Sequence, residues 1–366
     1  MIRVLQMIGA LEMGGSQALV MNLYRHMDRE RIQFDFVLDH PDRDDYAAEV
    51  REMGGRIFTI PGFHGNVGEI RRSWNGFFKE HPEYRILHSH VRSYASLYLP
   101  VARRNGLKTI IHSHSTSNGS GLSSLVKMAL QYPLRYQADV LMSCTREAGA
   151  WLYGERACRG ENFFLLKNGV DTVRFAFDEE VRRRYRKELG VEDKLVIGHV
   201  GRFHEAKNHG FLLDCFARLR QLRPDALLLL VGDGELRGDI ERKIKELGLE
   251  TSSLLPGSRS DVPELMWAMD ALAFPSKWEG LPVTVVEAQA AGLPCFISDR
   301  ISREVDISPL VRRLSIDDPE LWARELAGPL PRQDVSEAVV RAGYDINDSV
   351  DRLSRLYEKL YREANI

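Results

Sequence analysis

The chain has 366 residues, more than the roughly 250–300 residues that one hydrophobic core usually supports, so two domains are expected. Hydrophobic residues make up 44% and charged residues 28%, which is an ordinary profile for a globular protein. Lys and Arg number 50 against 52 for Asp and Glu, so the overall charge excludes a bulk attraction to nucleic acid. Any basic patch must be local.

The cysteines and the N-terminal segment indicate the compartment. The four cysteines, at positions 144, 158, 215 and 295, have no CxxC spacing, so the sequence predicts neither a disulfide framework nor a zinc site. The apolar run before Glu12 is too short for the core of a signal peptide or for a membrane span. We therefore interpret it as the first strand of a cytoplasmic enzyme.

Short apolar runs alternate with helical patterns along the chain, which is typical of parallel sheets built from βαβ units. In the first half, the runs predict strands over Ile2–Ile8, Phe34–Leu38, Arg56–Ile60, Ile86–His88, Thr109–His112, Val140–Ser143 and Phe163–Leu166. A turn signal at 168–171 and a charge-dense stretch at 178–188 then predict a linker near Asn168–Phe177.

The second half repeats the pattern and predicts a second doubly wound domain. Its strands are expected over Leu195–Val200, Ala226–Val231, Ser253–Leu255, Ala271–Phe274 and Cys295–Ile297. The chain ends in an amphipathic helix, Ser349–Tyr361, whose apolar face is formed by Val350, Leu353, Leu356 and Leu360. The predicted class is α/β, with two Rossmann-like domains, residues 1–172 and 173–346.

The segment Ile70–Lys79 has two interpretations. Its apolar residues, Ile70, Trp74, Phe77 and Phe78, share one helical face, and its basic residues lie elsewhere. A core helix with solvated charges explains this pattern. The alternative is a basic amphipathic surface that approaches a membrane, which would make the protein peripheral at the cytoplasmic face of the inner membrane.

The most informative stretch is Phe274–Pro294, where a predicted strand leads through a loop with Glu279 into a helix with Glu287. Gly280 is expected to allow an unusual backbone turn, and Pro282 suits the first helical position. The unpaired backbone N–H groups at the start of this helix would favour an anion such as a diphosphate. Glu287 is the only charge between Leu281 and Leu293, and a lone charge in an apolar helix needs a partner.

The two glutamates, seven residues apart and with Gly-Leu-Pro after the first, resemble the signature of retaining glycosyltransferases with the GT-B fold. This large family includes sucrose synthases and bacterial polysaccharide transferases, and the resemblance covers nearly the whole chain. It implies two Rossmann-like domains that face a cleft, with a final helix, residues 347–366, crossing back to the N-terminal domain. It also implies that Glu287 binds the ribose and Glu279 the sugar hydroxyls, assisted by the backbone of Gly280 and Leu281.

Three further loops of the second half carry candidate site residues, and two of these loops resemble the same family. Arg202 and Lys207 follow the first strand and match the family's Gly-Arg and Lys motif, which implies that they neutralise the donor diphosphate. Asn208 stands where a glycine often occurs and is expected to cap the next helix. Gly232 and Gly234, in the second loop, are expected to permit a tight turn beside the nucleotide. The third loop, which contains Arg259, resembles the family loop whose backbone faces the base.

In the first half, the glycine pair Gly14-Gly15 is expected to let the backbone approach the sugar or phosphate, with Ser16 and Gln17 opening a helix. Histidines at 88, 90, 112 and 114 suggest a metal site, but no acidic or cysteine partner is spaced to complete one. By resemblance, His114 matches the family histidine between donor sugar and acceptor. The other three are expected to be strand-end residues.

The resemblance thus implies transfer of a hexose or N-acetylhexosamine from a nucleotide sugar, with UDP as the expected nucleotide. The acceptor would be a glycan or a lipid-linked sugar in cell-surface polysaccharide biosynthesis, and neither a metal nor another cofactor is expected. Arg202, Lys207, Glu279 and His114 are the expected catalytic residues. Two alternatives remain: a UDP-sugar 2-epimerase of the same fold and a non-catalytic sugar-nucleotide-binding protein.

Overall fold

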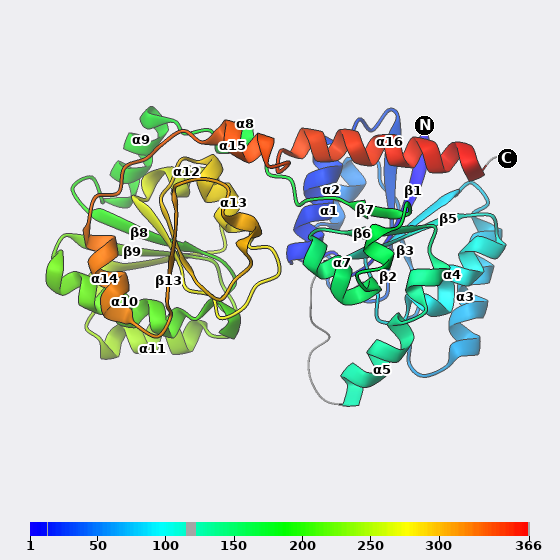
Figure 1. Cartoon of the computed structure of the whole chain (residues 1–366), viewed down its shortest axis with the longest axis horizontal. Coiled ribbons are helices and arrows are strands. Elements are labelled where there is room, and N and C mark those ends of the chain that lie inside the picture. Colours follow the sequence, from blue (N-terminus) through cyan, green and yellow to red (C-terminus); the bar gives the residue numbers. More distant parts are fainter. Residues whose placement is uncertain (13, 115–121, 365–366) are drawn as a thin grey trace. The chain divides into compact units, whose positions relative to one another are not determined.

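The computed structural model describes residues 1–12, 14–114 and 122–364. The chain divides into two compact units, Met1–Gly169 with Ile346–Ile366, and Val170–Asp345 (Figure 1). The chain therefore leaves the first unit and returns to it. These boundaries lie within a few residues of the positions named above, 172/173 and 346/347.

The first unit contains a seven-stranded parallel sheet in the order β3-β2-β1-β4-β5-β6-β7, among its described residues. Its strands are β1 (Ile2–Gly9), β2 (Ile32–Leu38), β3 (Ile57–Thr59), β4 (Ile86–Ser89), β5 (Lys108–Ser113), β6 (Val140–Ser143) and β7 (Phe163–Leu165). Each overlaps a predicted strand. Because both faces of a parallel sheet are covered, its strands are near-continuous apolar runs, which is why the sequence revealed them.

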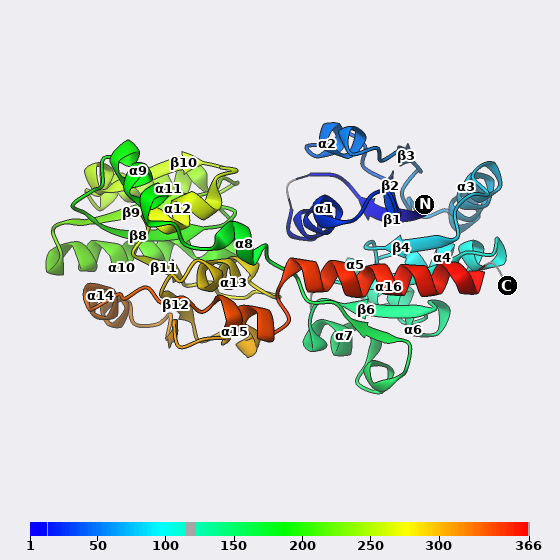
Figure 2. The same cartoon turned by 90° about the horizontal axis from the view of Figure 1, so that it is seen from above.

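Helices cover both faces of this sheet. They are α1 (Gly15–His26), α2 (Ala47–Glu52), α3 (Val67–Glu80), α4 (Ala95–Arg104), α5 (Leu122–Gln131), α6 (Leu134–Gln137), α7 (Arg146–Tyr153) and α16 (Ile346–Ala364), with the 3-10 turn η1 (Ala157–Arg159). The final helix, α16, packs beside α1 on the face formed by Val4, Ile86 and Ile110 (Figure 2). Its contacting residues include Val350, Leu353 and Leu360, as the amphipathic pattern predicted.

The membrane interpretation of Ile70–Lys79 is wrong for its apolar face. Ile70, Trp74, Phe77 and Phe78 lie on α3 and are buried in the core between that helix, α4 and the sheet. Trp74 stacks on Tyr98 of α4, with ring centroids 4.6 Å apart. A face that is filled by its own domain cannot also insert into lipid.

The second unit contains a six-stranded parallel sheet in the order β10-β9-β8-β11-β12-β13. Its strands are β8 (Leu195–Val200), β9 (Ala226–Val231), β10 (Ser253–Gly257), β11 (Ala271–Phe274), β12 (Cys295–Ser298) and β13 (Val311–Leu314). The edge strand β13 was missed because Arg312 and Arg313 interrupt its apolar run. One side of an edge strand tolerates such charges.

The helices of the second unit also lie on both faces of its sheet (Figure 1). They are α8 (Thr172–Phe175), α9 (Glu179–Leu189), α10 (His209–Leu222), α11 (Arg237–Glu246), α12 (Val262–Ala268), α13 (Val283–Ala290), α14 (Pro319–Ala327) and α15 (Ser336–Arg341), with 3-10 turns η2 (Glu205–Lys207), η3 (Glu250–Ser252) and η4 (Arg303–Val305). The predicted linker, Asn168–Phe177, is not a flexible connection, because part of it packs into the second unit. Val170 and Phe175 are buried in the core of this unit, and Val170 bridges to Asp345.

No helix within residues 1–12, 14–114 and 122–364 combines the length and apolar character that crossing a membrane would need.

Candidate functional site

The strand order of the second unit determines where a ligand site can form. Strands β8 and β11 are adjacent, yet the chain continues from β8 to β9 on one side and from β11 to β12 on the other. The loops that follow β8 and β11 therefore diverge at the carboxyl edge of the sheet. Doubly wound sheets bind their ligands at such a switch point.

An ion pair joins these two loops. Lys207 Nζ lies 2.7 Å from Glu279 Oε1, and the two side chains are only 17% and 14% exposed. Lys207 also stands over the ring of Phe274, the last residue of β11, at 4.5 Å from its centroid. Two residues that are 72 positions apart in the sequence are thus brought together.

The backbone of the β8 loop is tied to the same place. The Lys277 amide donates to the Ala206 carbonyl at 2.7 Å, and the Asn208 side chain donates to the Pro275 carbonyl at 3.2 Å. Asn208 has φ 58°, the only positive φ of a non-glycine among the described residues. It occupies the N-cap position of α10, as expected, but its side chain makes no cap hydrogen bond. The left-handed backbone explains why Asn or Gly suits this position.

Glu287 lies in the second turn of α13, where the sequence placed it. Burial raises the pKa of its carboxyl to about 7, and the charge of Lys207 partly offsets this rise. Among the described residues, no hydrogen bond to this carboxylate is present. A half-buried acid without a partner is the strongest sign in this unit of an unfilled binding role.

The start of α13 differs from the expectation in two respects. Helix α13 begins at Val283, and Pro282 is its N-cap rather than its first helical residue. Gly280 lies in a bend, but it is not among the described glycines with positive φ, so this bend does not need the conformation that only glycine adopts easily. Gly280 and Leu281 still lie directly before the helix, between Glu279 and its N-terminus.

Arg202 lies on the other side of the β8 loop. Its side chain is 68% exposed and lies 3.4 Å from Glu235, in the loop after β9. Arg202 and Lys207 therefore have different carboxylate partners in this structure. Arg259 is also exposed and pairs with Asp261 at 2.6 Å, two residues along the chain.

Gly232 and Gly234 serve close backbone packing. A Cβ atom at Gly232, where φ is 140°, would lie 2.1 Å from the Gly201 carbonyl oxygen, and one at Gly234 would lie 2.6 Å from that of Phe203. The glycines therefore let the β9 loop press against the loop that carries Arg202 and Lys207. The fingerprint of dinucleotide folds is not needed to explain them.

Sequence reasoning missed two buried histidines beneath Lys207. His199, on β8, stacks on Phe274 with centroids 5.4 Å apart, and its ring lies 4.7 Å from that of His209, the first residue of α10. Burial and the nearby Lys207 charge lower the pKa of His209 to about 4. Burial also lowers the pKa of His199 well below its usual range, so both rings are neutral near pH 7 and support the loop through packing. Their place at the end of β8 and the start of α10 was the available signal.

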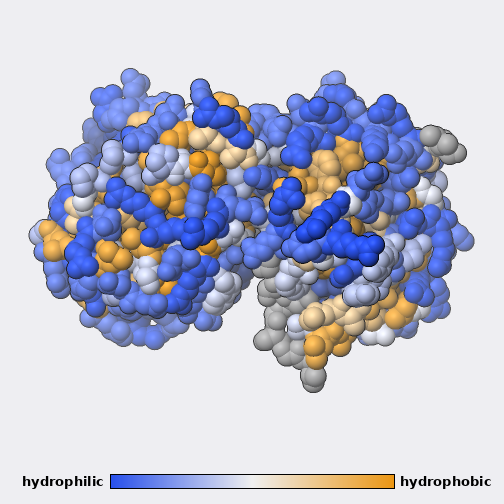
Figure 3. Space-filling view, in the orientation of Figure 1, coloured by the Kyte–Doolittle hydropathy of each residue, from blue (hydrophilic) through white to orange (hydrophobic). Residues whose placement is uncertain are grey.

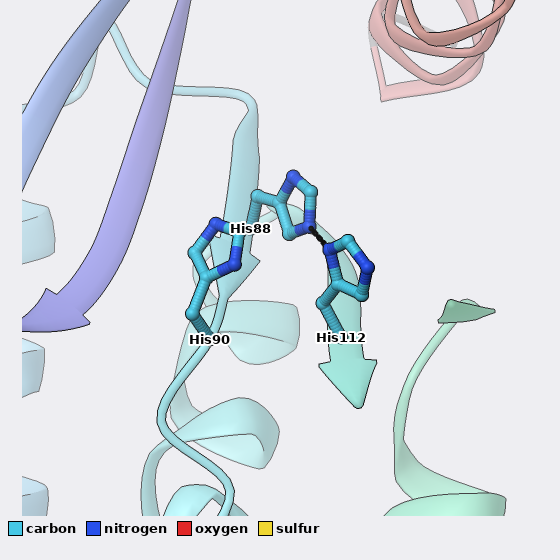
Figure 4. Close-up of side chains that lie close together, drawn as sticks. All are labelled: His88, His90 and His112. Carbon is cyan, nitrogen blue, oxygen red and sulfur yellow. Dashed lines mark hydrogen bonds between the residues drawn. The ribbon is translucent and has the colours of Figure 1, made fainter. Parts of the chain in front are cut away.

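The remaining predicted residues lie in the first unit. Gly14 is the N-cap of α1 with extended backbone, and the helix begins at Gly15, one residue earlier than expected. A Cβ at Gly15 would meet nothing within 4 Å. His114 follows β5 and contacts the ring of His90, next to the buried cluster drawn in Figure 4. Burial lowers the pKa of His114 to about 3.

Comparison with known proteins now identifies the class. The family model described as "Glycosyl transferases group 1" matches residues 181–325, and the model described as "Glycosyltransferase Family 4" matches residues 13–174. The chain is similar to HepE of Anabaena, solved in complex with UDP, with a TM-score of 0.73 at 16% identity over 99% of this chain and 98% of that one. The fold is GT-B.

Two curated relatives narrow the identification. Putative glycosyltransferase EpsF of Bacillus subtilis (strain 168) is 36% identical over 368 residues, which covers 97% of this chain and 96% of EpsF. The UDP-Gal:alpha-D-GlcNAc-diphosphoundecaprenol alpha-1,3-galactosyltransferase of Escherichia coli is 28% identical over 67% of this chain and 66% of its own length. The chain belongs to the group 1 glycosyltransferases.

The burial of Glu287 makes stability depend on pH. Its folded-state pKa, about 7, lies above the ordinary 4.5, so the carboxylate destabilises the folded unit fully above pH 7 and not at all below pH 4.5. We expect Glu287→Gln to stabilise the second unit at pH 8, by up to about 3 kcal/mol, and to have little effect at pH 4.5. Hydrogen exchange of second-unit peptides in increasing urea measures both values.

The matched control is Glu246→Gln, because Glu246 is exposed at the end of α11. It should change stability little at either pH. An equal gain for Glu287→Gln at both pH values, or no gain at pH 8, would contradict the assignment of a destabilising buried carboxylate.

Proposed function

We propose that the chain is a retaining transferase that moves a hexose or N-acetylhexosamine from a UDP-sugar to a glycan or lipid-linked acceptor in cell-surface polysaccharide biosynthesis. The observation that carries this proposal is the group of Lys207, Glu279 and Glu287 at the switch point of the second unit. The names of the relatives support the donor and the acceptor, since one uses UDP-Gal on a diphosphoundecaprenol-linked sugar and another structure holds UDP.

Binding of the donor would break the ion pair between Lys207 and Glu279. In the free protein, Lys207 is neutralised by Glu279 at 2.7 Å. A diphosphate carries more negative charge than one carboxylate, so it would draw Lys207 away from Glu279. Glu279 would then be free to accept hydrogen bonds from the sugar hydroxyls. Binding of the phosphate by Lys207 would thus release Glu279 to bind the sugar, so the two events are coupled through the Lys207–Glu279 pair.

The ribose and the outer phosphate oxygens have their own partners. The Glu287 carboxylate lacks a partner among the described residues and would accept bonds from the two ribose hydroxyls. Arg202, which is exposed and 3.4 Å from its carboxylate partner, is held loosely enough to turn toward the diphosphate. The Gly280 and Leu281 amides before α13 would add backbone donors.

Positioning and charge stabilisation would carry the catalysis. In the proposed mechanism the acceptor hydroxyl attacks from the face that the diphosphate leaves, and a leaving phosphate oxygen takes its proton, so the anomeric configuration is retained. Lys207 and Arg202 would stabilise the charge that develops on the diphosphate. No covalent intermediate on a carboxylate is invoked. His114 of the first unit is proposed to meet a hydroxyl group of a bound sugar.

The alternatives are weaker. A UDP-sugar 2-epimerase would need acid and base carboxylates, whereas Glu279 is held by Lys207 and the family is one of transferases. A non-catalytic binding protein would share the donor site. Turnover is what separates it from an enzyme, and the next experiment measures that.

The first expected result concerns the two cations. Lys207→Ala and Arg202→Ala should each lower kcat on the order of 10²–10³-fold, because each removes a charge from the departing diphosphate. Steady-state kinetics with a panel of UDP-sugars and a diphosphoundecaprenol-linked acceptor measures this, and NMR of the product identifies its anomer. Lys277→Ala is the matched control, since Lys277 lies in the adjoining loop after β11 but pairs with the exposed Glu205.

The control variant should keep nearly full activity. Activity near the wild-type level in the Arg202→Ala, Lys207→Ala double variant would refute the phosphate role. An inverted product anomer would refute retention and leave the donor site intact.

Metal independence is the second expected result. The proposed donor site neutralises the diphosphate with Arg202 and Lys207, a task that a divalent cation performs in other transferases. We therefore expect the rate of transfer to be unchanged in EDTA and unchanged when magnesium or manganese is added. Loss of activity in EDTA that either metal restores would show that the two cations are not sufficient.

A lipid-linked acceptor is favoured by one surface of the first unit. Leu125, Val126 and Met128 of α5 are 61%, 58% and 53% exposed, and Tyr132 and Tyr136 follow at 58% and 71% (Figure 3). Residues 114–138 include two basic residues and no Asp or Glu. An exposed apolar helix with flanking tyrosines and positive charge suits the interface of an anionic membrane.

We expect the protein to float with vesicles that contain anionic lipid and to bind neutral vesicles less. The variant Leu125→Ser, Val126→Ser, Met128→Ser should lose most of this binding, because it removes apolar area from the helix. A matched control changes exposed apolar residues of the second unit, Val173→Ser and Leu222→Ser. Equal flotation of both variants would show that α5 is not the membrane surface.

A further inference from the structure

Six buried or partly buried side chains of the first unit form one hydrogen-bonded chain. His114 Nε2 lies 2.8 Å from His90 Nδ1, and His90 Nε2 lies 3.0 Å from Gln6 Oε1. Gln6 Nε2 donates to the Tyr357 hydroxyl at 3.2 Å, and that hydroxyl lies 2.7 Å from His88 Nδ1.

His88 Nε2 lies 3.3 Å from His112 Nδ1, as the dashed line in Figure 4 shows. His112 Nε2 is buried and has no partner among the described residues. This chain of hydrogen bonds thus begins at His114, beside the carboxyl end of β5, passes through residues of β1 and α16, and ends at His112 inside the unit.

A metal ion is the obvious alternative occupant, because nitrogens of His88, His90 and His112 lie within 4.8 Å of one another. Both nitrogens of His90 and of His88 are, however, already used in hydrogen bonds. Among the residues that the structure describes, no carboxylate or thiolate joins this cluster, and a buried divalent charge without an anion is costly. Arg92 adds a further positive charge that lowers the pKa of His114.

Burial leaves each of these rings neutral near pH 7. It lowers the pKa of His88 to about 3, and those of His90 and His112 well below the usual range. A neutral imidazole has one N–H and one bare nitrogen. In each histidine, therefore, if one nitrogen donates a hydrogen bond, the other must accept one. The direction of donation at one end of the chain then determines the direction at every later hydrogen bond.

Gln6 is the member that sets this direction. An imidazole or a phenol can donate or accept, but the amide oxygen of Gln6 only accepts and its nitrogen only donates. Because Gln6 Oε1 faces His90 Nε2, that nitrogen carries the proton and His90 Nδ1 is bare. His114 Nε2 must then donate to His90 Nδ1, and His114 Nδ1 is left bare.

The other half of the chain follows from the same amide. Gln6 Nε2 donates to Tyr357, so the single hydroxyl proton of Tyr357 goes to His88 Nδ1. His88 Nε2 then donates to His112 Nδ1, and the proton of His112 lies on its buried Nε2. With the Gln6 amide in this orientation, every donor and acceptor up to His112 is satisfied.

We propose that Gln6 is a positioning residue that holds His114 as the neutral tautomer with a bare Nδ1, so that His114 accepts a hydrogen bond from a sugar hydroxyl. The contact of His114 with a sugar rests on the proposed function, whereas the tautomer does not. His114 is in this state a hydrogen-bond acceptor and not an acid. Its own position fits this role, because it is partly buried and its Nδ1 has no partner among the described residues.

The location of Gln6 explains why its amide is held in one position. Gln6 lies on β1, is 1% exposed, and stands opposite His88 in the register of β1 and β4. These two strands are the neighbours at which the sheet order of the first unit reverses. The amide is thus fixed between β4 and α16 on the same face of the sheet.

The tautomer is tested without any substrate. Imidazole 15N resonances separate a protonated ring nitrogen from a bare one, so 15N-labelled wild-type protein should show His114 with Nε2 protonated and Nδ1 bare. In Gln6→Met the acceptor for His90 is lost, and His114 should become a mixture of tautomers. The opposite tautomer in the wild type, or an unchanged tautomer in Gln6→Met, would overturn the proposal.

Activity provides the second test, because the Gln6 variants should rank differently in kcat and in stability. Gln6→Glu keeps an oxygen that accepts from His90, but it buries a charge. Gln6→Met keeps the length of the side chain but removes its donor and its acceptor. Positioning predicts that Gln6→Met loses kcat on the order of 10-fold, the scale on which loss of a partner that orients a functional histidine is felt. Gln6→Glu should recover most of this loss although it is the less stable variant. A purely structural role predicts the same order for activity and for stability.

Tyr98→Phe is the control for stability alone. Its hydroxyl bonds to Ser89 on the other face of the same sheet, at 2.6 Å, and contacts none of the histidines. It should lower stability and leave kcat within about twofold. Zinc binding that saturates the wild type and is lost in His112→Asn would overturn the proposal, because a metal would take the nitrogens that the chain uses. If no sugar is transferred by the wild type, the proposed function fails, and the 15N spectra still decide the role of Gln6.

Discussion

The ion pair between Lys207 and Glu279 is the constraint around which the second unit is organised. It closes the gap between two loops that leave neighbouring strands in opposite directions, and a doubly wound sheet always leaves such a gap at its switch point. The glycines of the β9 loop, the left-handed Asn208 and the Asn208–Pro275 hydrogen bond all hold the backbone that presents Lys207. A pair that is mostly buried is specific in geometry but yields little net stability, because desolvation offsets the attraction. In the proposed function, this pair keeps the two charges in place until a more strongly charged ligand competes for Lys207.

The same logic explains why Glu287 is tolerated. An acid that is half-buried without a partner costs folding free energy, and natural proteins keep such groups where a ligand supplies the missing bonds. The apolar face of α13 supplies enough packing to hold the helix in spite of this residue, since Val285, Val286 and Ala288 are fully buried. The destabilising carboxylate and the stabilising packing lie on the same short helix.

The sequence predicted most of the fold because parallel strands buried on both faces are continuous apolar runs. It missed β13, an edge strand with two arginines, and it placed Pro282 and Gly15 one position away from their structural roles, since helix ends depend on backbone geometry that spacing alone does not reveal. The candidate site residues of the second unit could be named from the sequence because they lie on loops next to strong strand signals. Sequence spacing could not show which ion pairs form. Lys207 pairs with Glu279 and Arg202 pairs with Glu235 only because the folded loops bring these residues together.

The histidine chain shows the limit of local reasoning most clearly. Alternating histidines at the ends of two strands suggest a metal site, and the three-dimensional cluster retains that geometry. The residue that decides between a metal site and a hydrogen-bonded chain is Gln6, together with Tyr357, which is 351 positions away in the sequence. A glutamine inside an apolar strand carries no functional signal by itself. It acquires one only in the folded network, where its amide oxygen can only accept and its amide nitrogen can only donate, so that the orientation of the amide sets the protonation of every ring connected to it.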